Sequence, residues 1–271
     1  MEPQNFDYLC KFLKDNSGYA LTPEKNYLIE NRLGPVAKAY EMESIGDLIK
    51  RLQNERNEKL QREIIEAFTT NETLFFRDTR PFNDLRDKIF PTIFEKKTTS
   101  RSLRIHCAAC SSGQEPYSLT MLIAEEVPQL KDWNVSVSAS DVNQSILDKA
   151  QAGIYCDFEV KRGLPDKYRD KHFKDIGNGK WQLDIAVRSK VKFRQHNLMQ
   201  PFAMHEKADL LMCRNVLIYF DPPTKKRVFN YLADNIETDG YLMLGSAESV
   251  VGYSDRFELV PGTSGAYRKV A

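Results

Sequence analysis

Residues 103–116 read Leu103-Arg104-Ile105-His106-Cys107-Ala108-Ala109-Cys110-Ser111-Ser112-Gly113-Gln114-Glu115-Pro116, which predicts a strand, a tight turn and the start of a helix. The strand covers residues 103–107, and the small residues from Ala108 to Gly113 suit a turn. The helix begins at Glu115-Pro116, because proline is well tolerated in a first helical turn. Ligands of an open α/β sheet bind at the carboxyl ends of the strands, where small residues let them approach the backbone. This unit therefore predicts an α/β fold with a ligand site at the turn.

The same alternation of strand and helix continues toward the C-terminus. Further strands are predicted over Val135–Ala139, Val191–Gln195, Asp209–Cys213 and Tyr241–Gly245, with helices from about Gln144 and over Thr224–Asn235. Strands that alternate with helices indicate a parallel, doubly wound sheet. Residues 257–260 and 265–269 predict a closing antiparallel hairpin. The segment of about forty residues before Val191 predicts a small excursion with a hairpin.

The first 70 residues predict several short helices and no strand. Ile29, Leu33, Val36, Ala37 and Tyr40 fall at helical spacing, as do two later apolar stripes. Gly34-Pro35 is expected to bend or break the first of these segments, because proline lacks the N–H that a helix interior needs. The sequence thus predicts a helical N-terminal region before the α/β region.

Composition places the chain among soluble globular proteins. The 39 Lys and Arg residues nearly balance 38 Asp and Glu residues, so no global field favours nucleic acid or anionic lipid. No apolar run is long enough for a membrane span, and residues 1–5 lack the features of a signal peptide. Five scattered cysteines suit free thiols in the cytoplasm, and Cys107 and Cys110 lack a second pair to complete a zinc site. The histidines at 106, 172, 196 and 205 have no metal-ligand spacing, so no metal is expected.

Asp141 follows the second predicted strand, about 30 residues after Ala109. A carboxylate at this position can accept hydrogen bonds from two ribose hydroxyls. The dinucleotide fingerprint G-x-G-x-x-G is missing, since Gly113 is the only glycine of the turn, which disfavours NAD and favours another adenosine ligand. The alternative is an ordinary tight turn followed by a helix-capping Asp.

A second motif is Thr69-Thr70-Asn71-Glu72-Thr73-Leu74-Phe75-Phe76-Arg77, at the junction of the two regions. Arginine is the side chain best suited to binding a carboxylate through two hydrogen bonds. The alternative is a capped helix end with both phenylalanines in the core and Arg77 in water.

A third motif runs from Asp209 to Asp221, where a buried strand leads into Arg214-Asn215 and then Tyr219. The alternative, a core strand that ends in a solvated turn, would explain only the apolar first half of this motif. Arg214 and Asn215 at the carboxyl end of a strand favour a site.

Taken together and in order, these motifs resemble the CheR family, the S-adenosylmethionine-dependent protein-glutamate methyltransferases of bacterial chemotaxis. The resemblance spans nearly the whole chain and rests on Arg32-Leu33-Gly34-Pro35, residues 71–77, 111–119, 139–141, 196–198 and 213–221, and Gly240-Tyr241-Leu242-Met243-Leu244-Gly245-Ser246-Ala247-Glu248-Ser249. The turn differs from the usual family pattern, because Ala108 replaces a glycine and Gln114 replaces a glutamate.

The resemblance implies a Rossmann-like class I methyltransferase domain over residues 76–271, with a small antiparallel β-subdomain inserted at about 152–190. An all-α domain over residues 1–75 would recognise the substrate. Cofactor contacts of the family fall on Asn71, Thr73, Arg77, Glu115, Asp141, Asn197, Leu198, Arg214 and Asn215. Its catalytic pair falls on Arg77 and Tyr219.

The implied partner is the cytoplasmic domain of a chemoreceptor (a methyl-accepting chemotaxis protein), with no nucleic acid and no direct membrane insertion. Some relatives also bind a receptor's C-terminal pentapeptide through the β-subdomain. Residues 175–189 look shorter here, which favours an enzyme that needs no such tether. Two other functions stay open: a methyltransferase for a small molecule or RNA, and a non-catalytic cofactor sensor on the same fold.

Overall fold

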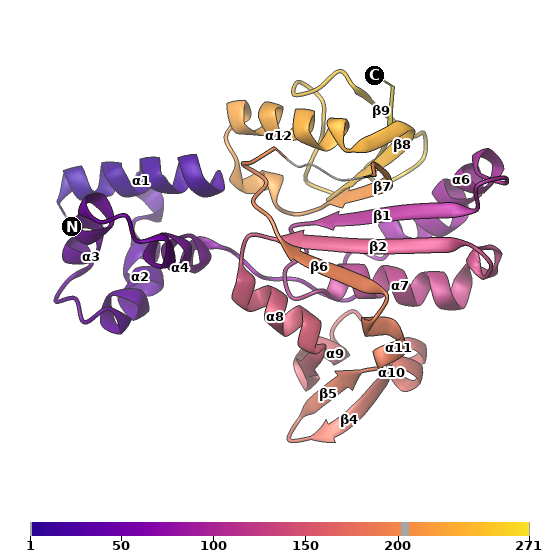
Figure 1. Ribbon diagram of the computed structural model, residues 1–271, viewed down its shortest axis with the longest axis horizontal. Helices are drawn as coiled ribbons and strands as arrows, with labels where there is room; N and C mark the ends of the chain where they lie inside the picture. Colours follow the sequence, from indigo (N-terminus) through magenta and orange to yellow (C-terminus); the bar gives the residue numbers. More distant parts are fainter. Residues whose placement is uncertain (1, 202–205, 271) are drawn as a thin grey trace.

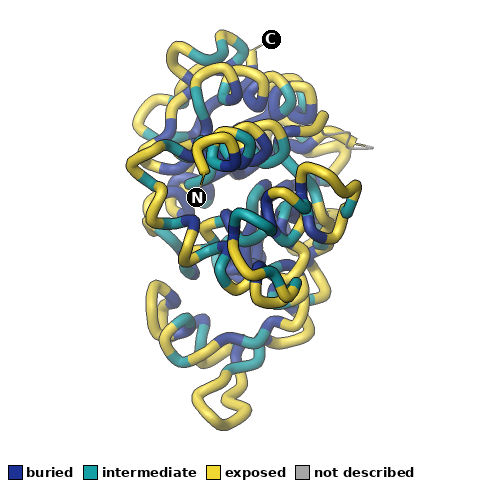
Figure 2. The backbone as a smooth tube through the Cα atoms, turned by 90° about the vertical axis from the view of Figure 1, so that its left-hand side faces the viewer, coloured by how far each residue is buried: buried dark blue, intermediate teal, exposed yellow. Residues whose placement is uncertain are grey.

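The computed structural model describes residues 2–201 and 206–270. It consists of an N-terminal helical region and a larger α/β region, from which a small β excursion projects (Figure 1). Figure 2 views the molecule from the side of the helical region, and exposed residues follow the outer turns of the chain while buried ones face inward. No helix in the described ranges is both long and apolar enough to cross a lipid bilayer.

The helical region has a hydrophobic core of its own. Its elements are α1 (Pro3–Ser17), the 3-10 helix η1 (Pro23–Lys25), α2 (Tyr27–Ala39), α3 (Ile45–Asn54) and α4 (Glu58–Phe68). The side chains of Ser44 and Asn57 accept backbone N–H groups at the starts of α3 and α4, as good N-caps do. The apolar stripes of these helices meet in one cluster, which includes Leu9, Leu13, Ile29, Leu33, Leu48, Ile49, Leu60 and Ile64.

Helix α2 runs unbroken through Gly34-Pro35, so the expected break is wrong. Proline inside a helix costs about 3 kcal/mol, because it removes one hydrogen bond and crowds the preceding turn. Ile29 and Leu33 before the proline and Ala37 after it are all buried on the same core. Burial of the two large side chains contributes about 1.5–3 kcal/mol each, which offsets that cost.

The α/β region is built on a seven-stranded sheet in the order β6-β2-β1-β7-β8-β10-β9. The first five strands are parallel, whereas β10 pairs antiparallel with both β8 and β9. This arrangement confirms the doubly wound sheet and the closing hairpin. In sheet order the strands are Val191–Gln195, Asn134–Asp141, Ser102–Ala108, Ala208–Cys213, Ile236–Leu244, Ala266–Lys269 and Phe257–Leu259.

Both faces of the sheet are covered by helices (Figure 1). Successive residues of β7 point to opposite faces, so Leu210 and Met212 join one apolar cluster while Leu211 and Cys213 join the other. The first cluster includes residues from α7 (Gln114–Glu126), α8 (Gln144–Ala152), α5 (Arg80–Asp84), a π-helix (Leu85–Ile89) and α6 (Phe90–Lys96). The second includes residues from α12 (Pro222–Asp234).

Strand β8 begins five residues earlier than the sequence predicts, at Ile236 instead of Tyr241. Asp239-Gly240 has the composition of a turn, and Asp239 indeed adopts a left-handed φ of 60°. The pairing register between β7 and β8 shifts between Ala208 and Leu210. The turn-like dipeptide therefore lies within the strand, at an irregularity in its pairing.

The excursion contains a second, three-stranded antiparallel sheet in the order β3-β5-β4, which confirms the predicted subdomain with its hairpin. The hairpin turns at Asn178-Gly179, where both residues have φ values near +60° (54° and 65°), as a type I′ turn requires. Its elements are β3 (Ile154–Cys156), α9 (Asp157–Lys161), α10 (Asp166–His172), β4 (Phe173–Gly177), β5 (Lys180–Leu183) and α11 (Ile185–Arg188).

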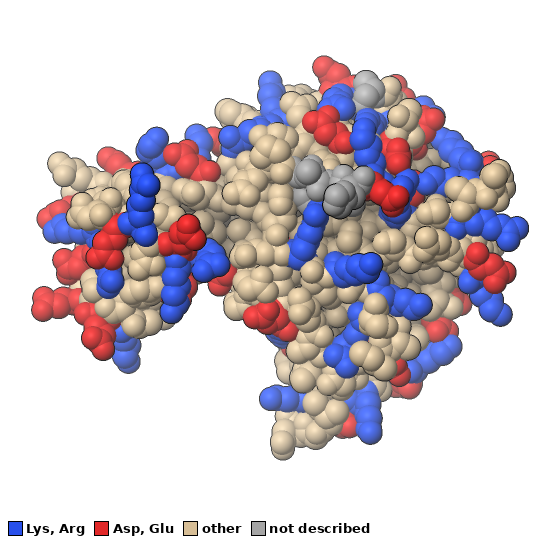
Figure 3. Space-filling view, in the orientation of Figure 1, with Lys and Arg blue, Asp and Glu red and all other residues tan. Residues whose placement is uncertain are grey.

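Positive and negative side chains are interspersed over the face shown in Figure 3. That face is hollowed between the helical region and the β excursion.

Candidate functional site

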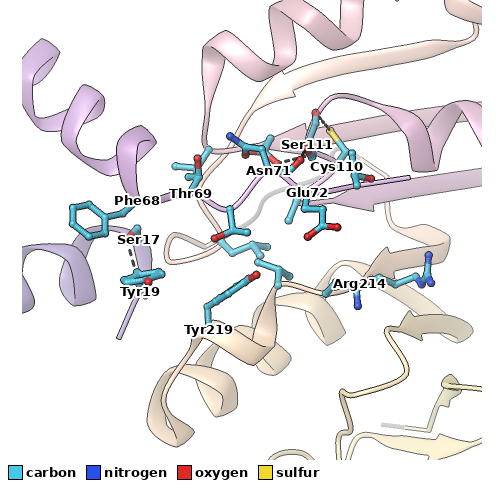
Figure 4. A pocket seen from close by; sticks show the side chains of 18 of the residues that line it. Ser17, Tyr19, Phe68, Thr69, Asn71, Glu72, Cys110, Ser111, Arg214 and Tyr219 are labelled. Atoms are coloured by element: carbon cyan, nitrogen blue, oxygen red, sulfur yellow. Dashed lines mark hydrogen bonds between the residues drawn. The ribbon is translucent and has the colours of Figure 1, made fainter. Parts of the chain in front are cut away.

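A cavity of about 1010 Å³, counting its open mouth, lies where the carboxyl ends of β1, β2 and β7 meet the helical region (Figure 4). The linker after α4 and the loops that follow these strands and β6 all contribute to its wall. The structure thereby brings together every residue predicted for the site: Asn71, Thr73, Arg77, Glu115, Asp141, Asn197, Leu198, Arg214, Asn215 and Tyr219.

The turn after β1 is held against Asp141. Ala109, Ser111 and Gly113 have positive φ values of 52°, 50° and 88°, so the chain turns tightly. The Ser111 N–H donates to Asp141 Oδ2 at 2.8 Å, and the Asn143 N–H donates to Oδ1 at 3.0 Å. Burial raises the pKa of Asp141, whereas these backbone N–H groups lower it. Each carboxylate oxygen has a second lone pair, so Asp141 can still accept hydrogen bonds from a diol.

The linker packs both phenylalanines of the second motif in the core, as the simpler interpretation expected. Phe75 contacts the rings of Tyr155 and Phe173, and Phe76 stacks on Tyr168. Arg77, however, is half-buried at the cavity, where its Nη1 donates to the Glu72 carbonyl at 3.0 Å.

Arg214 is the central buried charge of the site, with a side chain only 1% exposed. Its Nη1 donates to Glu115 Oε2 at 2.8 Å, and its Nη2 donates to Asp78 Oδ2 and to the Arg77 carbonyl, each at 2.9 Å. Its Nε is buried and has no hydrogen-bond partner among the residues described. Burial raises the pKa of Glu115, and the Arg214 guanidinium opposes that rise.

These groups fit S-adenosylmethionine. The buried carboxylate of Glu115 and the unpaired Nε–H of Arg214 complement the ammonium and carboxylate of an amino-acid end. Asp141, at the end of β2, complements the two hydroxyls of a ribose. In the ranges that the structure covers, no three His, Cys, Asp or Glu residues are grouped as metal ligands. His205 lies outside those ranges.

Three features of the site were not predicted. Ser17, Tyr19, Ile65 and Phe68 of the helical region also line the cavity. Tyr19 stacks on Tyr219, and the Ala20 N–H donates to the Tyr219 carbonyl at 3.2 Å. Outside the cavity wall, Glu248 accepts the N–H groups of the Asn215–Leu217 segment. No local sequence signal marks Tyr19, while Glu248 stands in one of the motifs quoted above without a role.

Comparisons with known proteins identify the family of the chain. The model described as "CheR methyltransferase, all-alpha domain" matches residues 4–69, and the "CheR methyltransferase, SAM binding domain" matches residues 71–266. Chemotaxis protein methyltransferase 1 of Vibrio cholerae serotype O1 is 40% identical over 98% of this chain and 97% of its own length. The chemotaxis protein methyltransferase of Vibrio parahaemolyticus is 39% identical over the same shares. Chemotaxis protein methyltransferase 1 of Pseudomonas aeruginosa is 37% identical over 96% of each chain. The chain therefore belongs to the CheR methyltransferase family.

Proposed function

We propose that the protein transfers the methyl group of S-adenosylmethionine to glutamate carboxylates on the cytoplasmic helices of chemoreceptors. The products are glutamate methyl esters and S-adenosylhomocysteine, and the reaction takes place in the cytoplasm. One observation carries the proposal: residues that can hold the cofactor (Glu115, Asp141 and Arg214) and residues that can hold an anionic acceptor (Arg77 and Tyr219) line a single cavity. The family membership of the chain supports the same chemistry.

The cofactor supplies an electrophilic methyl group on a sulfonium. Asp141 would accept hydrogen bonds from the ribose hydroxyls, Glu115 would accept them from the ammonium group, and Arg214 would donate to the carboxylate of the amino-acid end. Asn71, Thr73, Asn197, Leu198 and Asn215 complete the wall around it.

The acceptor needs no general base. A glutamate carboxylate has a reference pKa of about 4.3, so it is ionised at neutral pH. Arg77 or Tyr219 holds one carboxylate oxygen and leaves the other free to attack in line. The reaction neutralises charge, so alignment and the exclusion of water supply most of the rate enhancement.

We place the substrate between the helical domain, residues 1–75, and the methyltransferase domain, residues 76–271. Residues of both domains line the cavity, so a receptor helix that presents a glutamate there contacts both. We further propose that no receptor pentapeptide is required. A receptor fragment should be methylated equally with and without its last five residues, and strict dependence on them would reject this part of the proposal.

The central test is methyl transfer from labelled S-adenosylmethionine to a receptor cytoplasmic fragment. The Arg77→Ala and Tyr219→Phe variants should lose about 100-fold in turnover, as when a donor that stabilises a transition state is removed. Arg80→Ala and Tyr27→Phe, which change exposed residues outside the cavity, are the matched controls. Near-full turnover in both test variants removes Arg77 and Tyr219 from the mechanism. Label that resists mild base is not a methyl ester and would reject glutamate as the acceptor.

A further inference from the structure

The carboxylate of Glu248 accepts four backbone N–H groups. Its Oε2 accepts those of Asn215 and Gly245, both at 2.8 Å, and its Oε1 accepts those of Val216 at 2.9 Å and Leu217 at 2.7 Å. Glu248 is 8% exposed and does not line the cavity. One side chain thus ties the loop after β7 to the end of β8.

The N–H groups of Asn215, Val216 and Leu217 depend on this carboxylate, because they precede the first internal hydrogen bond of the 3-10 helix η4 (Leu217–Tyr219). Asn215 has a left-handed φ of 61°, and Val216 lies outside the helical and extended regions, with φ −125° and ψ −37°. A Cβ on Gly245 would lie 2.8 Å from Glu248 Oε2 and 2.9 Å from Asn215 Nδ2. The approach of β8 to the loop is therefore as close as glycine allows.

We propose that Glu248 is a positioning residue for methyl transfer. It fixes the backbone of residues 215–217, and this backbone places Asn215 and Tyr219 at the cavity wall. The inference rests on the proposed function, in which Tyr219 helps to hold the acceptor. Without Glu248 the loop relaxes, and the acceptor loses its alignment although most of the cofactor contacts persist.

The chemistry requires a carboxylate in particular. An ionised Glu has two oxygens with about four lone-pair sites and no hydrogen to donate, which matches four N–H donors. Glutamine has the same size but would turn an NH₂ group toward two of these donors. Aspartate keeps the charge, but it is one methylene shorter and cannot hold all four N–H groups in place.

A purely structural role is separated from positioning by a matched control at Asp84. Asp84 is 6% exposed and lies outside the cavity, and it accepts the Ser264 N–H at 2.7 Å and the Ser264 hydroxyl at 2.9 Å. Asp84→Asn therefore removes the charge of a buried carboxylate that accepts two hydrogen bonds and does not line the cavity.

The experiment compares Glu248→Gln, Glu248→Asp and Asp84→Asn in turnover on a receptor fragment, affinity for S-adenosylhomocysteine, and melting temperature. Turnover of Glu248→Gln should fall about 100-fold, the loss expected from misplacing a catalytic group by about 1 Å. Its affinity for S-adenosylhomocysteine should fall about 10-fold or less, because Glu115, Asp141, Asn197 and Leu198 lie outside the loop. Asp84→Asn should keep turnover within about 2-fold while its melting temperature falls.

Equal turnover losses in Glu248→Gln and Asp84→Asn at equal melting shifts would overturn the proposal. If Glu248→Gln does not fold, Glu248→Asp takes its place in the comparison, with an expected turnover loss of about 10-fold. Unchanged turnover in Glu248→Asp would also overturn the proposal. Hydrogen exchange at Asn215, Val216 and Leu217 should accelerate in either Glu248 variant, and unchanged protection there would refute the proposed contact. The proposed function alone would be refuted if the wild-type protein bound S-adenosylhomocysteine but esterified no glutamate. Hydrogen exchange needs no substrate, so it would still test the contact of Glu248 in that case.

Discussion

The aromatic rings of Tyr19 and Tyr219 stack with their centroids 6.2 Å apart and their planes 23° from parallel. Tyr19 also packs against Phe68 of α4 at 5.6 Å. The proposed catalytic tyrosine therefore rests on a residue of the helical domain, 200 positions away in the sequence. Figure 4 shows Tyr19 and Phe68 on one side of the cavity and Tyr219 below it. The shape of the cavity consequently depends on how the two domains dock.

Replacement of Tyr19 by Leu should lower turnover more than it lowers stability. It removes an aromatic contact worth about 0.5–1.5 kcal/mol and frees the Tyr219 ring to move. Tyr8→Leu is the control, because Tyr8 stacks on Phe12 within α1 and does not line the cavity. Steady-state kinetics and denaturant unfolding of both variants make the comparison. Equal turnover in the two would show that Tyr19 is only a packing residue.

Gly18→Ala should weaken the docking of α1. Gly18 has a φ of +72°, and a Cβ there would lie 2.7 Å from Met199 Sδ and 2.9 Å from the Phe220 ring. Crowding of this kind costs about 1–3 kcal/mol. Gly34→Ala, in the interior of α2 with nothing within 4 Å of the new Cβ, should instead stabilise by about 0.5–1 kcal/mol. Thermal melting of the two variants should therefore shift in opposite directions, and shifts of the same sign would contradict this account.

Arg214→Met should destabilise the protein by about 3–5 kcal/mol, because Glu115 would be left buried without its partner. Burial already raises the pKa of Glu115, and loss of Arg214 should raise it further. An acid whose pKa is raised by folding costs stability as pH rises above its unfolded pKa, here 4.5. The melting temperature of this variant should therefore lie further below that of the wild type at pH 8 than at pH 5.5. The double variant with Glu115→Gln should recover stability and lose this pH dependence.

The ion pair between Lys14 and Asp221, at 2.7 Å, joins α1 to the start of α12. Lys14 and the Thr224 hydroxyl and N–H hold the pKa of Asp221 down at about 2, below its ordinary 3.8. The contribution of ionised Asp221 to folding stability is therefore present above about pH 4 and is lost as pH falls toward 2. Because Lys14 is half exposed, solvent screens the ion pair and its contribution to stability is small. Asp221→Asn keeps a good helix N-cap, so unfolding midpoints should differ from wild type at pH 6 and converge near pH 2. A constant difference across that range would assign the effect to another cause.

Local patterns in the sequence were enough to predict most of the fold. Strand β6 occupies Val191–Gln195 as predicted, and the start of α7 lies within one residue of the prediction. Apolar alternation and small-residue turns extend over only a few residues, so they can be recognised without knowledge of the rest of the fold. Such patterns could not predict that α2 continues through Pro35, because the compensating burial comes from other helices.

The residue types around the cavity were also readable from the sequence, since the carboxyl ends of parallel strands necessarily meet at one edge of a sheet. The residues that hold them in place could not be predicted in this way. Tyr19 stacks on Tyr219, and Glu248 accepts the N–H groups of the Asn215–Leu217 backbone. These contacts join segments 30 to 200 residues apart, and domain docking and strand order bring them together. Hydrogen bonds and ring contacts act only over a few ångströms, so no local pattern encodes which distant side chain completes them.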